Sequence, residues 1–427
     1  MNPEPSELKS FPVTAGGDRP ARRWGLLLGL LVAAYYGFAA IHPDWFFALG
    51  INHYDAWFID TFALLASNDA VTRGLDPYAP NPLDYFHRPH VYSHWWLHLR
   101  DLGLTRADTL WLGLGLVGAF LFAALARLRP RAPGQIWWYA AVLCSSPVLL
   151  AAERANNDLV IFVLLAPLVP CLLSERRWAR WVPPFLVAAA AALKYYPAAA
   201  AVVLLAGANR NELRPRLFLT ALLLAVAGQN VARDLAVFGP LAPQPEGLLS
   251  FGAAGFFCEL GWTGWIPKLV CVGAGLVAAV CFWTKRFLQD WEPAADQRSG
   301  WLHFILGAAL LTGCFFMSPN HCYRWVFAIW LAPLLWTLPR DPAASPEVRR
   351  LARWTAGLLL VVLWWAPLCC IVLTRLVGVV RGATILRLAQ WSYLVEQPAD
   401  WAFFLCLLVF LTHFGRRGLA TLAGARP

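Results

Sequence analysis

Long apolar runs alternate with short polar connectors along nearly the whole chain. The runs lie near residues 24–40, 109–126, 136–152, 157–173, 182–206, 217–233, 265–284, 301–317, 322–338, 354–374 and 401–415. A helix needs about 20 apolar residues to cross the hydrocarbon core of a membrane. The pattern therefore predicts an all-α polytopic membrane protein with a bundle of about 11 or 12 transmembrane helices.

One run departs from this pattern because polar and helix-breaking residues interrupt it. Residues 182–206 contain Lys194 and Pro197 within the sequence LKYYP. Such an interruption indicates either a kinked helix or two half-length helices that form a hairpin. The hairpin agrees better with the distribution of charge described next.

The distribution of basic residues predicts the orientation of the helices. With the N-terminus in the cytoplasm and residues 182–206 as a hairpin, 23 of the 35 Lys and Arg residues are cytoplasmic, and 15 of the 25 acidic residues lie outside. Residues 1–24 are then a cytoplasmic tail, and residues 25–427 form a single transmembrane domain. The first apolar run could also be a signal peptide, but a signal anchor fits better because the remaining chain is membrane-embedded.

The longest polar segment is the first extracytoplasmic loop, residues 41–108. Between His53 and His98 it holds five Asp and five His residues among many aromatic ones. Residues 56–71 have apolar positions at helical spacing and predict an amphipathic helix on the membrane surface. A loop of this length is typical of a functional surface. The alternative is a solvated loop that contacts the bilayer through its aromatic side chains.

Composition narrows the functional class. Hydrophobic residues make up 59% of the chain and charged residues 14%, which leaves no room for a soluble domain. The net charge of +10 does not indicate nucleic-acid binding, because the basic residues lie in short clusters between apolar runs. Most of the ten Cys residues lie inside these runs. Cys258 and Cys322 fall in loops predicted on the same face, where a disulfide is a minor alternative to free thiols.

Several ionisable residues border the membrane from that outer face. They are Glu153, Arg154, Asp158, Lys194, His321 and Arg324. Charged groups at membrane depth are costly, so we expect them to pair or to line a polar cavity. Converging cations suit an anionic lipid phosphate, and a loop carboxylate suits a general base. The reaction that fits is sugar transfer from a polyprenyl phosphate, in which a single carboxylate suffices because the phosphate needs no general acid.

Four segments resemble the GT-C superfamily of membrane glycosyltransferases, specifically the bacterial proteins related to glycosyltransferase family 87. They are FIDTFALLASNDAVTRGLDPY (58–78), ERANNDLVIFVLLA (153–166), ALKYYPAAAAVVLL (192–205) and SPNHCYRWVFAIWLAPLL (318–335). The resemblance implies a GT-C-like fold and an inverting transferase. It assigns the base to Asp60, which precedes the GLDPY turn at the family's spacing, and places the family's K-x-x-P element on Lys194 and Pro197. The His-rich FHRPHVYSHWW run departs from the family's usual Y-P-P-like segment.

The ionisable residues and the resemblance together predict one site. Asp60 is the predicted base, with Asp55 as a second acidic candidate. The predicted substrate-binding residues are Lys194, Arg324, His321, Arg154, Asp158, Asp55 and His94. We expect no metal at His87, His90, His94 and His98, because Pro89 breaks helical spacing and no Cys is near. We expect no cofactor.

Each assignment has a structural alternative. Asp60 could be a solvated residue, residues 153–158 a structural ion-pair turn, and Lys194 a snorkelling side chain. His321 and Arg324 could cap and anchor a span, as Trp95 and Trp96 would anchor the loop. At the level of the whole protein, the alternatives are a transporter or flippase for a lipid-linked or anionic substrate, and a non-catalytic partner in a cell-envelope complex.

The sequence thus predicts a multi-pass protein of the bacterial inner membrane with its active site on the extracytoplasmic face. Its expected partners are a polyprenyl-phosphate sugar donor, with mannose or a similar sugar, a glycan or glycolipid acceptor, and membrane lipids. Nucleic acid is not an expected partner.

Overall fold

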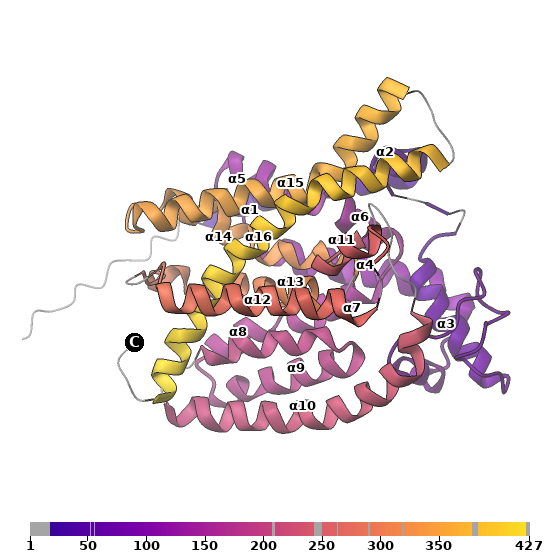
Figure 1. Ribbon diagram of the computed structural model, residues 1–427, viewed down its shortest axis with the longest axis horizontal. Coiled ribbons are helices and arrows are strands. Elements are labelled where there is room, and N and C mark those ends of the chain that lie inside the picture. The colour runs from indigo at the N-terminus through magenta and orange to yellow at the C-terminus, as the bar shows by residue number, and fades with distance from the viewer. Residues whose placement is uncertain are drawn as a thin grey trace, which may run out of the picture.

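The computed structural model describes residues 18–51, 53–54, 56–206, 210–242, 250–262, 264–288, 291–317, 320–377 and 383–423. Its elements are almost all helical, as the apolar pattern predicts (Figure 1). The strands described are β1 (Ser250–Phe251) and β2 (Asn320–His321), which form one short antiparallel ribbon.

Seven helices in the described part of the chain are long and apolar enough to cross a membrane. They are α1 (Asp18–Ile41), α4 (Thr109–Arg127), α10 (Arg210–Phe238), α12 (Trp265–Lys285), α13 (Arg298–Met317), α15 (Pro346–Val377) and α16 (Ala383–Ala423). An eighth crossing results if α5 (Pro133–Leu143) and α6 (Ser146–Glu153), bent by 55°, count as one span. The chain is therefore a multi-pass membrane protein.

Shorter or broken helices occupy the other apolar runs, which is why the full-length helices are fewer than the predicted 11 or 12. These elements are α7 (Asn157–Leu165), α8 (Leu168–Leu173), α9 (Val182–Leu193), the 3-10 helix η4 (Tyr196–Leu205), η8 (Cys322–Trp330) and α14 (Ala332–Thr337). Proline lies at each break: Pro167 before α8, Pro197 in the first turn of η4, and Pro333 in the first turn of α14. The predicted hairpin is confirmed, because α9 and η4 pack against each other across the Lys194 break.

The remaining elements are short and lie in the connectors. They are α2 (Asp44–Ala48), α3 (Ile59–Thr72), η1 (His94–Leu102), η2 (Arg106–Asp108), η3 (Arg177–Trp181), η5 (Gly239–Leu241), α11 (Ala253–Glu259), η7 (Ala295–Gln297) and η9 (Leu338–Arg340). Helix α3 confirms the helix predicted within residues 56–71. It does not lie open on a surface, however, because η1 covers it and most of its residues are buried.

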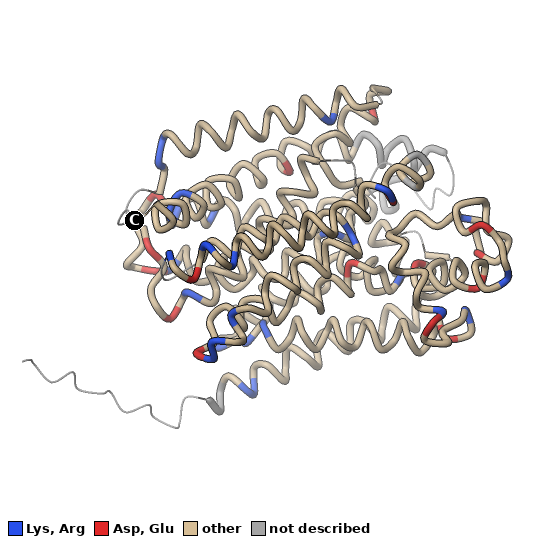
Figure 2. Tube along the Cα trace, turned by 90° about the horizontal axis from the view of Figure 1, so that it is seen from below, with Lys and Arg blue, Asp and Glu red and all other residues tan. Residues whose placement is uncertain are grey.

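The connectors gather at two ends of the bundle. Contacts at one end join distant segments of the chain: His53 with Glu153 (2.8 Å), His94 with Asp234 (3.0 Å) and Ser250 with His321 in the ribbon. Contacts at the other end join Arg180 with Glu212 (3.3 Å), Gln297 with Asp341 (2.9 Å) and Arg417 with Glu292. Figure 2 shows that most charged residues lie toward these two ends, as a membrane-spanning bundle requires.

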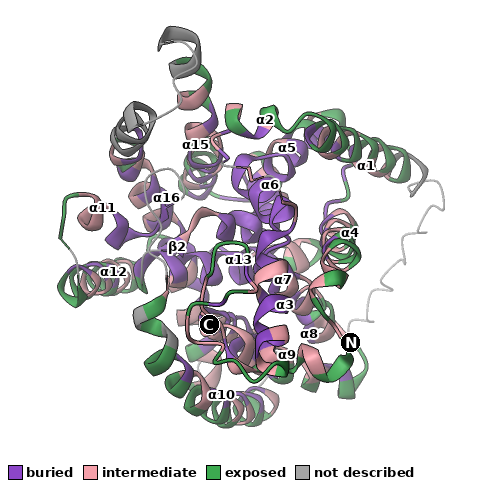
Figure 3. Ribbon diagram, turned by 90° about the vertical axis from the view of Figure 1, so that its right-hand side faces the viewer, coloured by how far each residue is buried: buried purple, intermediate pink, exposed green. Residues whose placement is uncertain are grey.

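Helix α13 forms the centre of the bundle (Figure 3). Nearly all its side chains are buried, and η4, η8 and α16 pack around it. Gly307 allows η8 to approach, since a Cβ there would lie 2.7 Å from the carbonyl oxygen of Phe327. Helices α1, α10 and α12 lie outside and expose apolar faces, which suits contact with lipid.

Candidate functional site

The start of α3 is fixed on the turn that joins α6 and α7. The backbone N–H of Phe58 donates to the carbonyl of Glu153 (3.0 Å), and that of Asp60 donates to the carbonyl of Arg154 (3.2 Å). The Thr61 hydroxyl donates to the Ala155 carbonyl (2.8 Å). Two predicted motifs, about 95 residues apart in sequence, therefore meet directly.

The Asp60 carboxylate is buried, and two donors hold it. Asn156 Nδ2 donates to Asp60 Oδ2 at 2.6 Å. The Asn156 side-chain oxygen also caps α7 by accepting from the Asp158 backbone N–H (2.9 Å). On the other side, Arg88 Nη1 lies 3.6 Å from Asp60 Oδ1. One carboxylate oxygen is thus anchored at close range, and the other has only a looser ion-pair contact.

Arg88 is itself positioned by the long loop. Its guanidinium makes two hydrogen bonds to Asp84, each 2.9 Å long, and a third to the Ile59 carbonyl (2.9 Å). Burial opposes ionisation of Asp84, but the hydrogen bonds and charge of Arg88 outweigh it and lower the pKa of that carboxyl. Because Arg88 is already paired with Asp84, its positive charge is partly neutralised. The main role of Arg88 in the site is therefore to hold Asp60.

A second carboxylate, Asp158, lies in the first turn of α7 and is completely buried. Lys194 Nζ and the Tyr196 hydroxyl both donate to Asp158 Oδ1, the latter at 2.7 Å. Lys194 comes from the break between α9 and η4, so the hairpin delivers it to α7. Asp158 is therefore paired with Lys194 rather than with Arg154. The Asp158 Oδ2 atom has no hydrogen-bond partner among the described residues.

Two buried arginines lack a close carboxylate partner in the described structure. Arg324 stacks over the Tyr196 ring, 4.1 Å from its centroid, and contacts Cys314 Sγ at 3.5 Å. The carboxylate nearest Arg154 in an ion pair is that of Glu153, 3.9 Å from Nε. The Nε atoms of both arginines are buried without a hydrogen-bond partner. A buried cation with unmet donors is costly unless a ligand or water completes its shell.

His321 links the groups just described. Its ring stacks on that of Tyr323, with 5.2 Å between the ring centroids. It also lies within electrostatic range of Asp60, Arg154, Lys194 and Arg324. Burial and then the Arg154 charge lower the pKa of His321 to about 4, so the ring is neutral near pH 7. A neutral imidazole can still donate one hydrogen bond to a ligand.

Two tyrosines complete this side of the site. The Lys194 ammonium lies 5.8 Å from the ring centroids of both Tyr92 and Tyr323. Burial, followed by the Asp60 charge, raises the pKa of Tyr92, so its hydroxyl stays protonated. Because Tyr92 belongs to the long loop and Tyr323 to η8, these rings close the site between segments far apart in the sequence.

Backbone strain is concentrated at this end. Within the described chain, four non-glycine residues have positive φ, and three of them lie here: Phe58 (60°), His87 (53°) and Ala155 (42°). Such conformations persist only where surrounding contacts enforce them. Phe58 and Ala155 flank the contact that carries Asp60. We infer that this contact is built for the placement of the carboxylate.

Further polar atoms here have no partner among the described residues. Neither polar atom of the buried Asn157 side chain has a hydrogen-bond partner, and Glu153 Oε2 has only the 3.9 Å ion-pair contact with Arg154 Nε, while the other Glu153 oxygen contacts His53 Nδ1 at 2.8 Å. Buried polar groups are normally hydrogen-bonded, so unmet groups within one turn of the chain indicate space for a polar ligand or water.

The structure thus brings together Asp60, Arg154, Asp158, Lys194, His321 and Arg324. It places His94 elsewhere: His94 Nδ1 lies 3.0 Å from Asp234 of α10. Asp55 lies outside the described residues. Cys258 and Cys322 are free thiols, so the minor disulfide alternative is not realised.

The other histidines of the loop make contacts of their own. Burial lowers the pKa of His90 to about 4, and His98 pairs with Asp101 at 2.7 Å. The predicted anchor Trp95 is exposed, but Trp96 is buried and its indole donates to the Leu193 carbonyl (3.1 Å). Trp96 therefore ties the loop to the hairpin that carries Lys194.

Sequence reasoning missed Arg88, Asn156 and Tyr92 as parts of the site. Arg88 and Tyr92 lie in the His-rich run, and Asn156 lies in the ERANND turn, so all three were within segments already singled out. Their roles depend on contacts with Asp60 and Lys194, which no local pattern reports.

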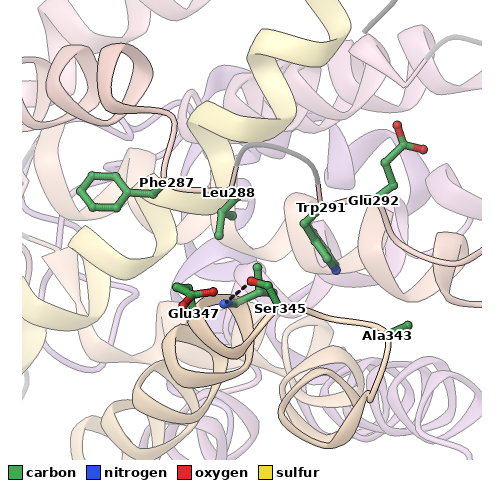
Figure 4. Close-up of a pocket in the computed structure, with 8 residues that line it drawn as sticks. Phe287, Leu288, Trp291, Glu292, Ala343, Ser345 and Glu347 are labelled. Atoms are coloured by element: carbon green, nitrogen blue, oxygen red, sulfur yellow. Dashed lines mark hydrogen bonds between the residues drawn. The ribbon is translucent and has the colours of Figure 1, made fainter.

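A separate cavity of about 450 Å³ lies at the opposite end of the bundle, between the segment after α12 and the start of α15 (Figure 4). Its lining residues are Phe287, Leu288, Trp291, Glu292, Ala343, Ser345, Glu347 and Val348. None of these is Lys or Arg, so this cavity does not suit an anionic ligand. Ser345 accepts the Val348 backbone N–H (3.3 Å) as part of the start of α15.

No protein-family model, curated protein or solved structure matches the chain.

Proposed function

We propose that this protein is an inverting membrane glycosyltransferase of the GT-C type that moves a sugar from a polyprenyl phosphate to an acceptor hydroxyl. The observation that carries the proposal is that two buried arginines with unmet donors, Arg154 and Arg324, and the fixed carboxylate of Asp60 all lie within electrostatic range of His321. The arginines suit a phosphate, and the carboxylate suits proton removal.

Each residue has a separate role in the proposed reaction. Because Asn156 anchors Asp60 Oδ2, the Oδ1 atom is the one that takes the acceptor proton. The acceptor oxygen then attacks the anomeric carbon while the bond from that carbon to the phosphate oxygen breaks. Arg324, Arg154 and Lys194 stabilise the departing polyprenyl phosphate electrostatically, with a hydrogen bond from neutral His321.

The distribution of charge supports a location for this reaction. The connectors at the end opposite Asp60 carry most of the Lys and Arg residues, which is the cytoplasmic signature in a bacterial cell membrane. The site then faces the extracytoplasmic side. The donor reaches it laterally from the bilayer, because its lipid gains about 0.8 kcal/mol per buried CH₂ group.

The test is sugar transfer by membranes that contain the protein and radiolabelled polyprenyl-phosphate sugars, mannose first. Label in a new glycan or glycolipid supports the proposal. Label that crosses the membrane still attached to the polyprenyl lipid would instead indicate a flippase, and absence of both activities with every donor would reject the transferase.

Replacing Arg324 with Lys should raise the donor KM about tenfold or more, because Lys loses the planar fork that binds phosphate and stacks on Tyr196. The matched control is Arg340→Lys. Arg340 also stacks on an aromatic ring, that of Trp336 at 3.7 Å, but at the opposite end of the bundle. Equal donor KM values for the two variants would remove Arg324 from the donor site.

Replacing Gly113 with Ala should reduce the transfer rate about 10²-fold while leaving membrane insertion intact. A Cβ at Gly113 would overlap the ring of Phe58, which precedes Asp60 by two residues, so the carboxylate would move. Gly118 lies on the same helix with nothing within 4 Å of its Cβ position, and Gly118→Ala is the control. Steady-state transfer rates at matched protein levels give the comparison.

A further inference from the structure

A second group of buried polar side chains lies on the first part of α16. Glu396 and Asp400 are one helical turn apart, and Gln397 Nε2 donates to Asp400 Oδ2 at 2.9 Å. Gln397 is only 2% exposed, and its Oε1 has no partner among the described residues. Because its amide already touches Asp400, this free oxygen belongs to the same cluster. The Ser392 hydroxyl, one turn before Glu396, is also buried and unpartnered.

The cluster belongs to the same end of the bundle as Asp60. The Tyr393 hydroxyl lies 3.4 Å from the Gly252 carbonyl, next to the ribbon in which Ser250 pairs with His321. The Cys322 thiol lies within electrostatic range of both Arg154 and Glu396. Residue 322 is therefore near both Arg154 and the α16 cluster.

The chemistry of the cluster differs from that of the donor site. No Lys, Arg or His in the described part of the chain forms an ion pair with Glu396 or Asp400, whereas four cations surround Asp60 and Asp158. Without an ion-paired cation among the described residues, this cluster does not suit a lipid phosphate. Carboxylate and amide oxygens instead accept hydrogen bonds from hydroxyl groups. The unmet acceptors match a neutral ligand rich in O–H donors.

We propose that Glu396, Gln397 and Asp400 form the subsite for the acceptor, and that the acceptor is a neutral polyhydroxylated sugar rather than an anionic one. This inference rests on the proposed transferase. Donor and acceptor then bind on separate groups, the donor beside the cations and the acceptor beside the carboxyl and amide groups of α16, and the acceptor hydroxyl is presented toward Asp60 from the α16 side.

The experiment uses the full-length protein in nanodiscs, with polyprenyl-phosphate mannose as donor and octyl mannoside as the acceptor probe. In Glu396→Gln and Asp400→Asn, the acceptor KM should rise about 10- to 100-fold, the cost of one or two hydrogen bonds to the acceptor, and the donor KM should stay within about twofold. Gln397→Met keeps both carboxylates and should raise the acceptor KM about tenfold. Glu292→Gln, at the opposite end, should change neither constant.

Direct binding of radiolabelled octyl mannoside separates this inference from the proposed reaction. Weaker binding by the α16 variants, with wild-type binding by Glu292→Gln, supports the subsite even if transfer itself is not observed. Unchanged binding in the α16 variants, or a donor KM that rises in place of the acceptor KM, would overturn it.

Discussion

Replacing Asp60 with Asn should lower the transfer rate by about 10²–10⁴-fold, the range expected for loss of a general base. Asn keeps the size of the side chain and can still contact Asn156 and Arg88, so the local structure should persist. The amide cannot take a proton from the acceptor. Single-turnover transfer from radiolabelled polyprenyl-phosphate sugar, at matched protein levels, measures the loss.

Asp69→Asn is the control for this prediction. Asp69 lies on the same helix, and its carboxylate pairs with Arg106 Nε at 2.8 Å, away from the buried cations. This partly buried pair does not touch the proposed site, so Asp69→Asn should retain nearly full transfer. If the Asp60 variant also retains transfer, the base is another group, and Asp55 is the first to test.

Binding of polyprenyl phosphate without its sugar distinguishes a lost base from a lost fold. The proposed phosphate contacts of Arg154, Lys194 and Arg324 do not need the Asp60 charge. Asp60→Asn should therefore bind this product at least as tightly as the wild type, because removing a nearby negative charge favours an anion. A variant that binds no polyprenyl phosphate has lost its structure, and its inactivity would say nothing about catalysis.

The features of the fold that depend on local sequence pattern could be predicted from the sequence. Apolar length predicted a polytopic helical protein, and the LKYYP interruption predicted the hairpin that carries Lys194. Charge bias predicted which connectors share one end, and this grouping brings Asp60, Arg154, Asp158, Lys194, His321 and Arg324 together. Each of these predictions depends on the composition of individual segments and connectors and does not require knowledge of the contacts between them.

The parts that the sequence left open depend on contacts between segments. An apolar run does not reveal whether it forms one straight span or two short helices, so the number of full-length helices was overestimated. The fit of Phe58 against Gly113 and the double role of Asn156 appear only when α3, α4 and α7 are placed together. The carboxylates of α16 had no local motif, and only the fold brings them to the site's end.

The buried pair of Asp158 and Lys194 should respond differently to single and double replacement. Either Asp158→Asn or Lys194→Met leaves one buried charge unpaired, and breaking such a pair costs about 3–5 kcal/mol. Both single variants should therefore melt well below the wild type in detergent micelles. The double variant removes both charges together and should recover most of the melting temperature, because no unpaired charge remains.

Transfer activity in the double variant distinguishes a purely structural role of Lys194 from a role in donor binding. If the lysine only neutralises Asp158, restored stability brings transfer back with it. If it also contacts the donor phosphate, as its place between Tyr92, Tyr323 and Asp158 favours, the stable double variant should keep a donor KM raised about tenfold or more. A pair replaced at Asp69 and Arg106 gives the reference for an ion pair outside the site. Recovery of both stability and donor KM would make Lys194 structural and leave the phosphate to Arg154 and Arg324.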